Sequence, residues 1–223
     1  MNEMILLGGI PNSGKTWLGK RIAEKDPKYV SLIPDALYDE LEKDSVKFFR
    51  YFDLVYPDSM ASLDIDPTRT DPLYLSKKRD EYRRSFRSEG EWIVLMEDLS
   101  DAYFVLQLAS YNGKIPIVEY GILNNLQNMK FFFKRRSEMA KKLGIDIDFD
   151  SFKKKLIYLD LGLYFSLKIL ESPDNKKPGY IDQGFIRKIY RSQKIPQTDD
   201  FLNLEVIVLK SIEEVNEFAD NFN

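Results

Sequence analysis

The sequence predicts an α/β domain built on a five-stranded parallel sheet with helices on both faces. Three observations lead to this fold class. Five short apolar runs alternate along the chain with longer segments of helical spacing, as in a parallel sheet with crossover helices. The runs are continuously apolar, which is typical of strands that are covered on both faces. A glycine-rich turn follows the first run, at the carboxyl end of a strand, where such sheets bind ligands.

The N-terminal part of the chain is predicted to contain two of these strands. Met4–Leu7 is the first apolar run, and the helical pattern after the glycines ends before Pro27. The second run, Tyr29–Ile33, leads into a charged helix that is predicted to continue to about Arg50. This strand–helix–strand order is typical of a parallel βαβ unit.

The middle of the chain, about 52–111, is predicted to be an excursion from the core fold. Residues 52–71 are rich in acids and show no clear period. A helix is then expected over about 71–88, because it begins with an aspartate at the N-cap and a proline at the first helical position. A further helix is expected where an apolar stripe runs from Trp92 to Leu106.

The C-terminal half is predicted to supply the remaining strands, which are Ile115–Glu119, Leu156–Leu159 and Glu205–Leu209. Helices are predicted between and after them, over about 124–143, from after Asp160 to about 170, from 181 and from 211. Residues 171–180 form a turn-rich segment that we interpret as a lid-like loop. The 223 residues are therefore expected to form a single domain with one excursion and one lid.

The composition limits the chemistry, because the chain contains no cysteine and no histidine. Disulfides, thiolate nucleophiles, imidazole bases and Cys/His zinc sites are therefore excluded. Carboxylates, lysine, arginine, hydroxyls, backbone amides and a hard metal ion remain. These groups suit phosphoryl transfer, in which positioning and charge stabilisation supply most of the catalysis.

The charge balance and the N-terminus limit the partners. The formal net charge is −3 and the pI is about 5.3, so the chain has no general attraction to nucleic acid or to acidic membranes. The first residues lack the basic start of a signal peptide, and no apolar run is long enough to span a bilayer. We therefore expect a cytoplasmic protein that does not bind membranes.

The turn after the first strand carries the strongest motif. Its spacing, Gly9-x4-Gly14-Lys15-Thr16, is the Walker A pattern, and it lies between a predicted strand and a predicted helix, as a phosphate-binding P-loop requires. Glycines let the backbone amides converge on phosphate at the helix start, the lysine reaches the β- and γ-phosphates, and the threonine hydroxyl ligates Mg²⁺. The residues predicted to bind ATP are Gly9, Ile10, Pro11, Asn12, Ser13, Gly14, Lys15, Thr16 and Trp17.

Four carboxylates are expected near the carboxyl ends of strands, namely Asp35, Glu119, Asp160 and, less clearly, Asp98. Asp35 is interpreted as a catalytic group that orients or deprotonates an acceptor hydroxyl, with a helix N-cap as the alternative. Glu119 is interpreted as a carboxylate that holds Mg²⁺ directly or through its waters, as a metal ligand together with Thr16, with an incidental loop charge as the alternative.

Basic residues form two further candidate features. Arg79, Arg83 and Arg87 are four residues apart and could form a stripe that meets an anionic substrate, although such a run is usually a solvated helix face. We take Arg83 as the substrate-binding member. Lys176 and Lys177 lie in the lid-like loop, where closure would bring positive charge to the transferring phosphate.

These motifs resemble the P-loop kinases that phosphorylate nucleosides, nucleotides and related acceptors. "GGIPNSGKT" is similar to their phosphate loop, and "VSLIPDALYDEL" is similar to the uridine kinase segment in which an aspartate and a tyrosine, here Asp35 and Tyr38, follow strand two. "IPIVEYGIL" resembles that family's Glu-Gly-Ile-Leu stretch, with Tyr120 inserted. "KLIYLDLGLYFSLKIL" and "YIDQGFIRKIY" resemble thymidylate and deoxynucleoside kinases. The resemblance implies that Tyr38 binds substrate and that Asp160 is structural and does not ligate metal.

We therefore predict a P-loop NTPase fold and a phosphotransferase that uses ATP and Mg²⁺. The acceptor is predicted to be a small molecule, with a nucleoside or nucleotide as the favoured class. One alternative is a kinase for a polynucleotide end or a nucleotide sugar, which the Arg79–Arg87 stripe would suit. Another is a non-catalytic nucleotide-binding protein. A GTPase switch is disfavoured, because "NKKP" at 175–178 lacks the aspartate that reads guanine in that family.

Overall fold

The computed structural model describes residues 3–66, 71–111, 113–119, 126–172, 181–195, 197–199 and 203–222. The strands are β1 (Glu3–Gly9), β2 (Tyr29–Leu32), β3 (Ile115–Glu119), β4 (Lys153–Leu159) and β5 (Leu204–Leu209). The helices are α1 (Lys15–Lys25), α2 (Pro34–Lys43), α3 (Ser45–Val55), α4 (Pro57–Ser62), α5 (Pro72–Arg84), α6 (Glu89–Ser110), α7 (Leu126–Lys142), α8 (Gly162–Leu170), α9 (Gln183–Ser192) and α10 (Ile212–Asn221).

The chain divides into two compact units. Unit 1 comprises Met1–Leu32, Tyr111–Phe133 and Asp148–Asn223. Unit 2 comprises Ile33–Ser110 and Lys134–Ile147, so it contains the predicted excursion together with α2, α3 and the second part of α7. Unit 2 therefore begins well before residue 52, because the chain leaves the sheet directly after β2.

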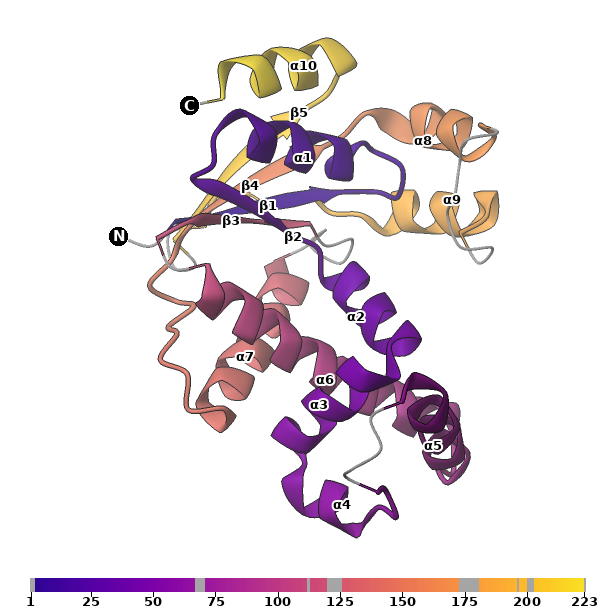
Figure 1. Ribbon diagram of the computed structural model, residues 1–223. Coiled ribbons are helices and arrows are strands. Elements are labelled where there is room, and N and C mark those ends of the chain that lie inside the picture. Colours follow the sequence, from indigo (N-terminus) through magenta and orange to yellow (C-terminus); the bar gives the residue numbers. More distant parts are fainter. Residues whose placement is uncertain are drawn as a thin grey trace. The chain divides into compact units, whose positions relative to one another are not determined.

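Unit 1 is built on a five-stranded sheet of order β2-β3-β1-β4-β5, in which every neighbouring pair is parallel (Figure 1). The strand β1 is central, and the order reverses beside it. In this register Leu7 is the partner of Glu119, and Gly9 is the partner of Leu159. The carboxyl ends of β1, β3 and β4 are thus adjacent, at the point where open α/β sheets bind ligands.

Both faces of the sheet are covered, as the continuous apolar runs predict. Ile5 and Leu7 pack in one core with Leu18 and Ile22 of α1, while α10 adds Val215 and Ala219 to the same core. In Figure 1, α1 and α10 lie on this face of the sheet. The alternate residues Met4 and Leu6 are also fully buried, so the opposite face is covered as well.

Unit 2 is helical, and its core is rich in aromatic side chains. Phe48 packs between Phe52 and Trp92, with ring centroids 5.9 and 5.4 Å away. Tyr51 of α3 stacks on Tyr103 of α6 at 4.6 Å. Helix α6 is the longest element at 22 residues, but neither it nor another described helix combines the length and low charge needed to cross a membrane.

Two expectations for unit 2 are corrected. The predicted single helix up to about Arg50 is two helices, because Asp44 interrupts it and its side chain accepts hydrogen bonds from Val46 N and Lys47 N at the start of α3. Part of 52–71, which we expected to be irregular, is helical, since α3 continues to Val55 and α4 follows. Residues 67–70 lie outside the described part of the chain.

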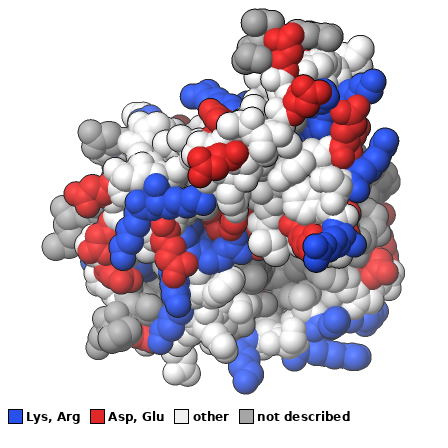
Figure 2. Space-filling model, turned by 90° about the horizontal axis from the view of Figure 1, so that it is seen from below, with Lys and Arg blue, Asp and Glu red and all other residues white. Residues whose placement is uncertain are grey.

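The charged surface is mixed. On the face shown in Figure 2, lysine and arginine lie interspersed with aspartate and glutamate. Many charges are paired, for example Lys47 with Glu40 at 2.7 Å and Lys78 with Glu81 at 3.4 Å. Exposed pairs of this kind add only about 0–1 kcal/mol each, so they mainly keep the surface solvated.

Candidate functional site

The loop between β1 and α1 has the backbone that its glycines predict. Gly9 has φ +130° and Gly14 has φ +91°, and Asn12 also has a positive φ of 63°. A Cβ on Gly9 would lie 2.7 Å from Leu159 O, so β4 leaves no room for a side chain. Gly14 is the N-cap of α1, whose first-turn amides have no acceptors within the helix. This arrangement suits an anion at the helix start.

Lys15 is held against the loop. Its side chain is buried, and Nζ donates to the backbone carbonyls of Gly9 at 3.0 Å and Ile10 at 2.9 Å. Asn12 Nδ2 donates to Ser166 O of α8 at 3.4 Å, which ties the tip of the loop to that helix. The ammonium group therefore lies at the inner edge of the loop, where it can neutralise phosphate charge.

Thr16 and Glu119 come together as the sequence predicted. The register of β1 and β3 places Glu119 beside the loop, and Thr16 Oγ1 donates to Glu119 Oε1 at 2.7 Å. The other carboxylate oxygen, Oε2, is buried and has no hydrogen-bond partner among the described residues. A buried carboxylate oxygen without a partner is costly, which indicates that it serves a ligand.

These groups fit Mg²⁺. A hydroxyl and a carboxylate are the hard oxygen donors that Mg²⁺ prefers, and the ion usually takes its remaining ligands from water and substrate phosphates. The described residues contain no group of three or more acidic side chains that could enclose a metal alone. The donor set therefore suits a metal that arrives with a triphosphate.

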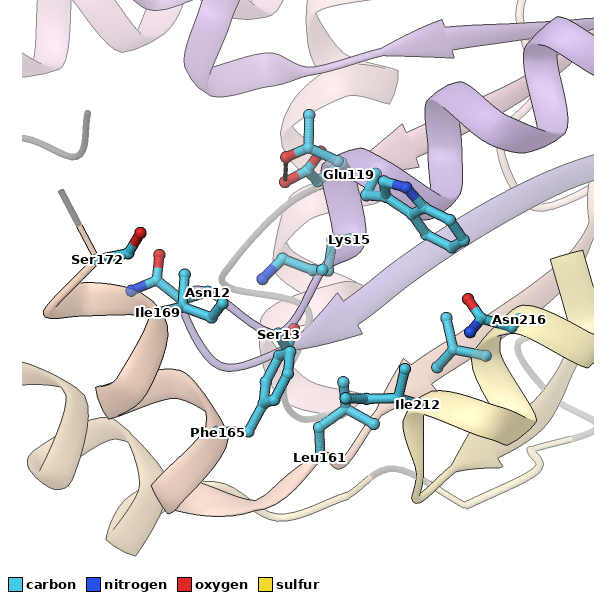
Figure 3. Close-up of a pocket in the computed structure, with 14 residues that line it drawn as sticks. Asn12, Ser13, Lys15, Glu119, Leu161, Phe165, Ile169, Ser172, Ile212 and Asn216 are labelled. Carbon is cyan, nitrogen blue, oxygen red and sulfur yellow. Dashed lines mark hydrogen bonds between the residues drawn. The ribbon is translucent and has the colours of Figure 1, made fainter. Parts of the chain in front are cut away.

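A cavity of about 560 Å³ opens beside the loop, within unit 1 (Figure 3). Lys15 and Glu119 mark its polar end. Phe165, Leu161 and Ile212 lie together on another side of it. It is lined by Asn12, Ser13, Gly14, Lys15, Thr16, Trp17, Glu119, Leu161, Phe165, Ile169, Ser172, Ile212, Val215 and Asn216.

Six of the nine predicted ATP-binding residues, from Asn12 to Trp17, line the cavity, whereas Gly9, Ile10 and Pro11 are not among its lining residues. Sequence reasoning missed the contributions of α8 and α10. Their apolar residues have the helical spacing of ordinary core positions, so no sequence signal distinguishes the ones that line a cavity.

Asp35 and Tyr38 lie on α2 of unit 2. The N-cap of α2 is Ile33, so the alternative interpretation of Asp35 as an N-cap is wrong. Asp35 is exposed in the first turn, where a negative charge is favoured by the helix dipole. Burial raises the pKa of the Tyr38 hydroxyl, and the charges of Glu42 and Glu97 raise it further, so Tyr38 is a neutral hydrogen-bond donor at pH 7.

Arg83 lies on α5 of the same unit and has partners there. Its Nη2 donates to Glu89, and its Nη1 lies 3.9 Å from Glu42 Oε1. The guanidinium carbon lies 5.4 Å from the ring centre of Trp92. These contacts fix the guanidinium within unit 2, and substrate binding by Arg83 stays a prediction.

The remaining candidates divide in three ways. Asp160 follows β4 but does not line the cavity, and its N–H donates to Leu209 O at 2.9 Å. Asp98 was expected near the end of a strand, and this prediction is wrong. Asp98 lies within α6, and its Oδ1 lies 3.2 Å from Arg135 Nη2. Tyr120 and residues 173–180, including both lysines of the predicted lid, lie outside the described residues.

The sheet order and the loop together define the class. A central β1, a phosphate loop that leads into α1, and a carboxylate at the end of the neighbouring β3 make this a P-loop NTPase fold. The fold predicted from the sequence is thus confirmed.

The sequence matches no protein-family model and no curated protein. Several solved structures are similar. A thymidylate kinase from Candida albicans is 13% identical, over 98% of this chain and 90% of that one, with a TM-score of 0.47. A sugar kinase from Janibacter is 13% identical, over 98% of this chain and 92% of that one, with a TM-score of 0.46. A gluconokinase from Sinorhizobium meliloti is 11% identical, over 98% of this chain and 94% of that one, with a TM-score of 0.41.

Proposed function

We propose that the protein is a phosphotransferase that uses Mg²⁺-ATP to phosphorylate a small acceptor, with a nucleoside or nucleotide as the favoured class. The observation that carries the proposal is the contact between Thr16 Oγ1 and Glu119 Oε1, with the second carboxylate oxygen buried and unpartnered beside the phosphate loop. This is a metal-binding pair next to an anion-binding loop. Few functions other than handling a nucleoside triphosphate need both.

Each residue would have a separate task. Lys15 would neutralise the charge that develops on the β- and γ-phosphates, and the loop amides would hold the same groups in place. Thr16 and Glu119 would hold Mg²⁺, which when bound would supply positive charge to neutralise the phosphates. These roles follow the position of each group at the polar end of the cavity.

Asp35 is proposed to orient the acceptor. Its carboxylate would accept the hydroxyl proton as the acceptor oxygen forms a bond to the γ-phosphorus. The bond from the γ-phosphorus to its bridging oxygen breaks in the same step, and ADP leaves with that electron pair. Tyr38, one turn further along α2, would donate a hydrogen bond to the acceptor.

The central experiment is thermal unfolding with and without Mg²⁺-ATP for the native protein and the Lys15→Ala variant. Ligand at about 100 times its dissociation constant adds roughly 2.7 kcal/mol to the native protein and should raise its Tm, whereas the variant should respond little. Lys20→Ala, an exposed lysine on the same helix, is the matched control and should respond like the native protein. An equal shift in Lys15→Ala would place the nucleotide elsewhere.

A further inference from the structure

The cavity beside the phosphate loop has one side without charged groups, which we call the apolar wall. It consists of Trp17, Leu161, Phe165, Ile169, Ile212 and Val215, which come from α1, the segment around α8, and α10. The wall is continuous with the polar end of the same cavity, where Lys15 and Glu119 lie (Figure 3). A triphosphate on the loop would therefore direct the rest of its molecule toward this wall.

Part of the apolar wall is left uncovered by the residues that the structure describes. Trp17, Ile169 and Ile212 are 49%, 39% and 46% exposed, although large apolar side chains are usually buried. Apolar surface that gathers at the mouth of a cavity indicates a ligand with an apolar face. The planar base of a nucleoside triphosphate is such a face, and the volume of about 560 Å³ is ample for it.

Three backbone amides next to the wall already donate internal hydrogen bonds. In the turn from β5 into α10, Lys210 N donates to Glu214 Oε2 at 2.7 Å, and Glu214 N donates to Ser211 Oγ at 3.1 Å. Val215 N donates to Ser211 O at 3.1 Å. These amides are therefore not available to read the hydrogen-bonding edge of a base.

The side chains offer little more for that purpose. Apart from the residues of the phosphate loop and Glu119, the described lining contains two polar side chains, those of Ser172 and Asn216. Neither is charged, and Asn216 lies on the exposed side of α10. A carboxylate, which would pair with the two adjacent donors of guanine, is missing from this part of the described lining.

We propose that the site holds the base of its nucleotide by its faces and not by its edge, so the protein uses ATP and GTP alike as phosphoryl donors. This inference rests on the proposed triphosphate site and concerns its selectivity. Adenine and guanine share one bicyclic ring and differ only in the groups on their edges. A site that hydrogen-bonds a group of its substrate rejects analogues that lack this group by factors of about 10⁴. An apolar pocket discriminates far less between ligands of similar shape.

The test is calorimetric titration of the native protein with Mg²⁺ complexes of ATP, GTP and tripolyphosphate. The dissociation constants for ATP and GTP should agree within about tenfold, and tripolyphosphate, which lacks a base, should bind at least about tenfold more weakly. A larger preference for either purine overturns the inference but leaves the proposed function intact. Failure of every triphosphate to bind in a Lys15-dependent manner overturns the proposed function itself.

Variants separate the wall from the rest of the site. Trp17→Ala should weaken ATP and GTP equally, by about tenfold for one lost stacking surface, and leave tripolyphosphate unchanged. Tyr164→Ala is the matched control, because Tyr164 lies on α8, is 79% exposed and does not line the cavity. Asn216→Ala should leave the ratio of ATP to GTP affinity within the same tenfold. A loss of binding for only one purine in either variant would show that the edge is read.

Discussion

The two units of the protein are stabilised in different ways. Unit 1 depends on a backbone framework, in which parallel strands meet at one edge and glycines shape a loop beside it. Unit 2 depends on side chains, namely an aromatic core and a network in which Arg135 pairs with Glu97, Asp98 and Asp101. Backbone sites need particular residues at fixed spacings, so they can be recognised in a sequence. Side-chain networks join residues from distant positions and leave no such pattern.

The largest effect is expected at the catalytic candidate in unit 2. If Asp35 orients the acceptor, Asp35→Asn should lower the rate of phosphoryl transfer by roughly 10²- to 10⁴-fold. ATP affinity should barely change, and the lost helix-dipole interaction should cost less than about 1 kcal/mol of stability. Transfer would be measured with a panel of nucleosides and nucleotides, together with ATP binding by calorimetry.

The matched control is Asp39→Asn on the same helix, since Asp39 is 61% exposed and pairs only loosely with Lys43 at 3.9 Å. It should transfer phosphate at the native rate. Native activity in Asp35→Asn would place the catalytic acid on another residue. Loss of ATP binding would show instead that Asp35 belongs to the nucleotide site.

The next largest effect is expected at the backbone of unit 1. Gly9→Ala should destabilise the protein by on the order of 3 to 5 kcal/mol, because a side chain is disfavoured at φ +130° and its Cβ would lie 2.7 Å from Leu159 O. Gly144→Ala in unit 2 should cost about 1 kcal/mol, because its φ is +66° but no atom lies within 4 Å of the added Cβ. Urea unfolding would measure both, and equal costs would contradict the close approach of β4.

A smaller effect is expected in the ion network of unit 2. Arg135→Met should destabilise the protein by about 2 to 3 kcal/mol at pH 7, because it leaves three carboxylates with one fewer cation. The cost is below that of a fully buried pair, since 22% of the Arg135 side chain is exposed. Lys134→Met, at a side chain that is 74% exposed, is the control and should change stability little.

The cost of Arg135→Met should depend on pH. Burial already raises the pKa of the Asp101 carboxyl, against the opposing effect of Arg136 and Arg135. Losing Arg135 removes a charge that lowers the folded-state pKa of Asp101, so this pKa rises further. The penalty is therefore full at neutral pH and shrinks as the Asp101 carboxyl protonates on acidification. Urea unfolding at several pH values would measure this, and a penalty that does not change with pH would rule out an electrostatic origin.

The smallest effect is expected for the metal carboxylate of unit 1. Glu119→Gln should raise the Mg²⁺ concentration needed for tight ATP binding by about tenfold, because an amide cannot supply the anionic ligand. Asp160→Asn should change it much less, since Asp160 does not line the cavity. Titration of Mg²⁺ at fixed ATP would compare the two variants. A stronger effect at Asp160 would reverse their assignments.

The sequence predicted unit 1 better than unit 2. All five strands were recognised, although β4 begins at Lys153, three residues before its predicted start, because charged residues precede its apolar run. Thr16 and Glu119, which the sequence assigns to one metal ion, are in contact, because a Walker A loop and a strand-end acid meet at one edge of a parallel sheet. Their role as metal ligands stays a prediction. In unit 2 the break at Asp44 and the helical start of residues 52–71 were not predicted. The break at Asp44 is marked by a local N-cap that was missed, whereas the packing of aromatic rings on α3 leaves no local spacing.

What the sequence by itself determined is the phosphate loop, because positive φ at Gly9 and Gly14 is a property of single residues and of their spacing. It also determined the parallel sheet, because continuous apolar runs require cover on both faces. Only the tertiary structure decided that Phe165 and Ile169 of α8 and Ile212 of α10 line the cavity, whereas Ala219 of α10 lies in the core. Helical periodicity marks a face as apolar in both cases. Whether protein or ligand covers that face depends on neighbours that are distant in the sequence.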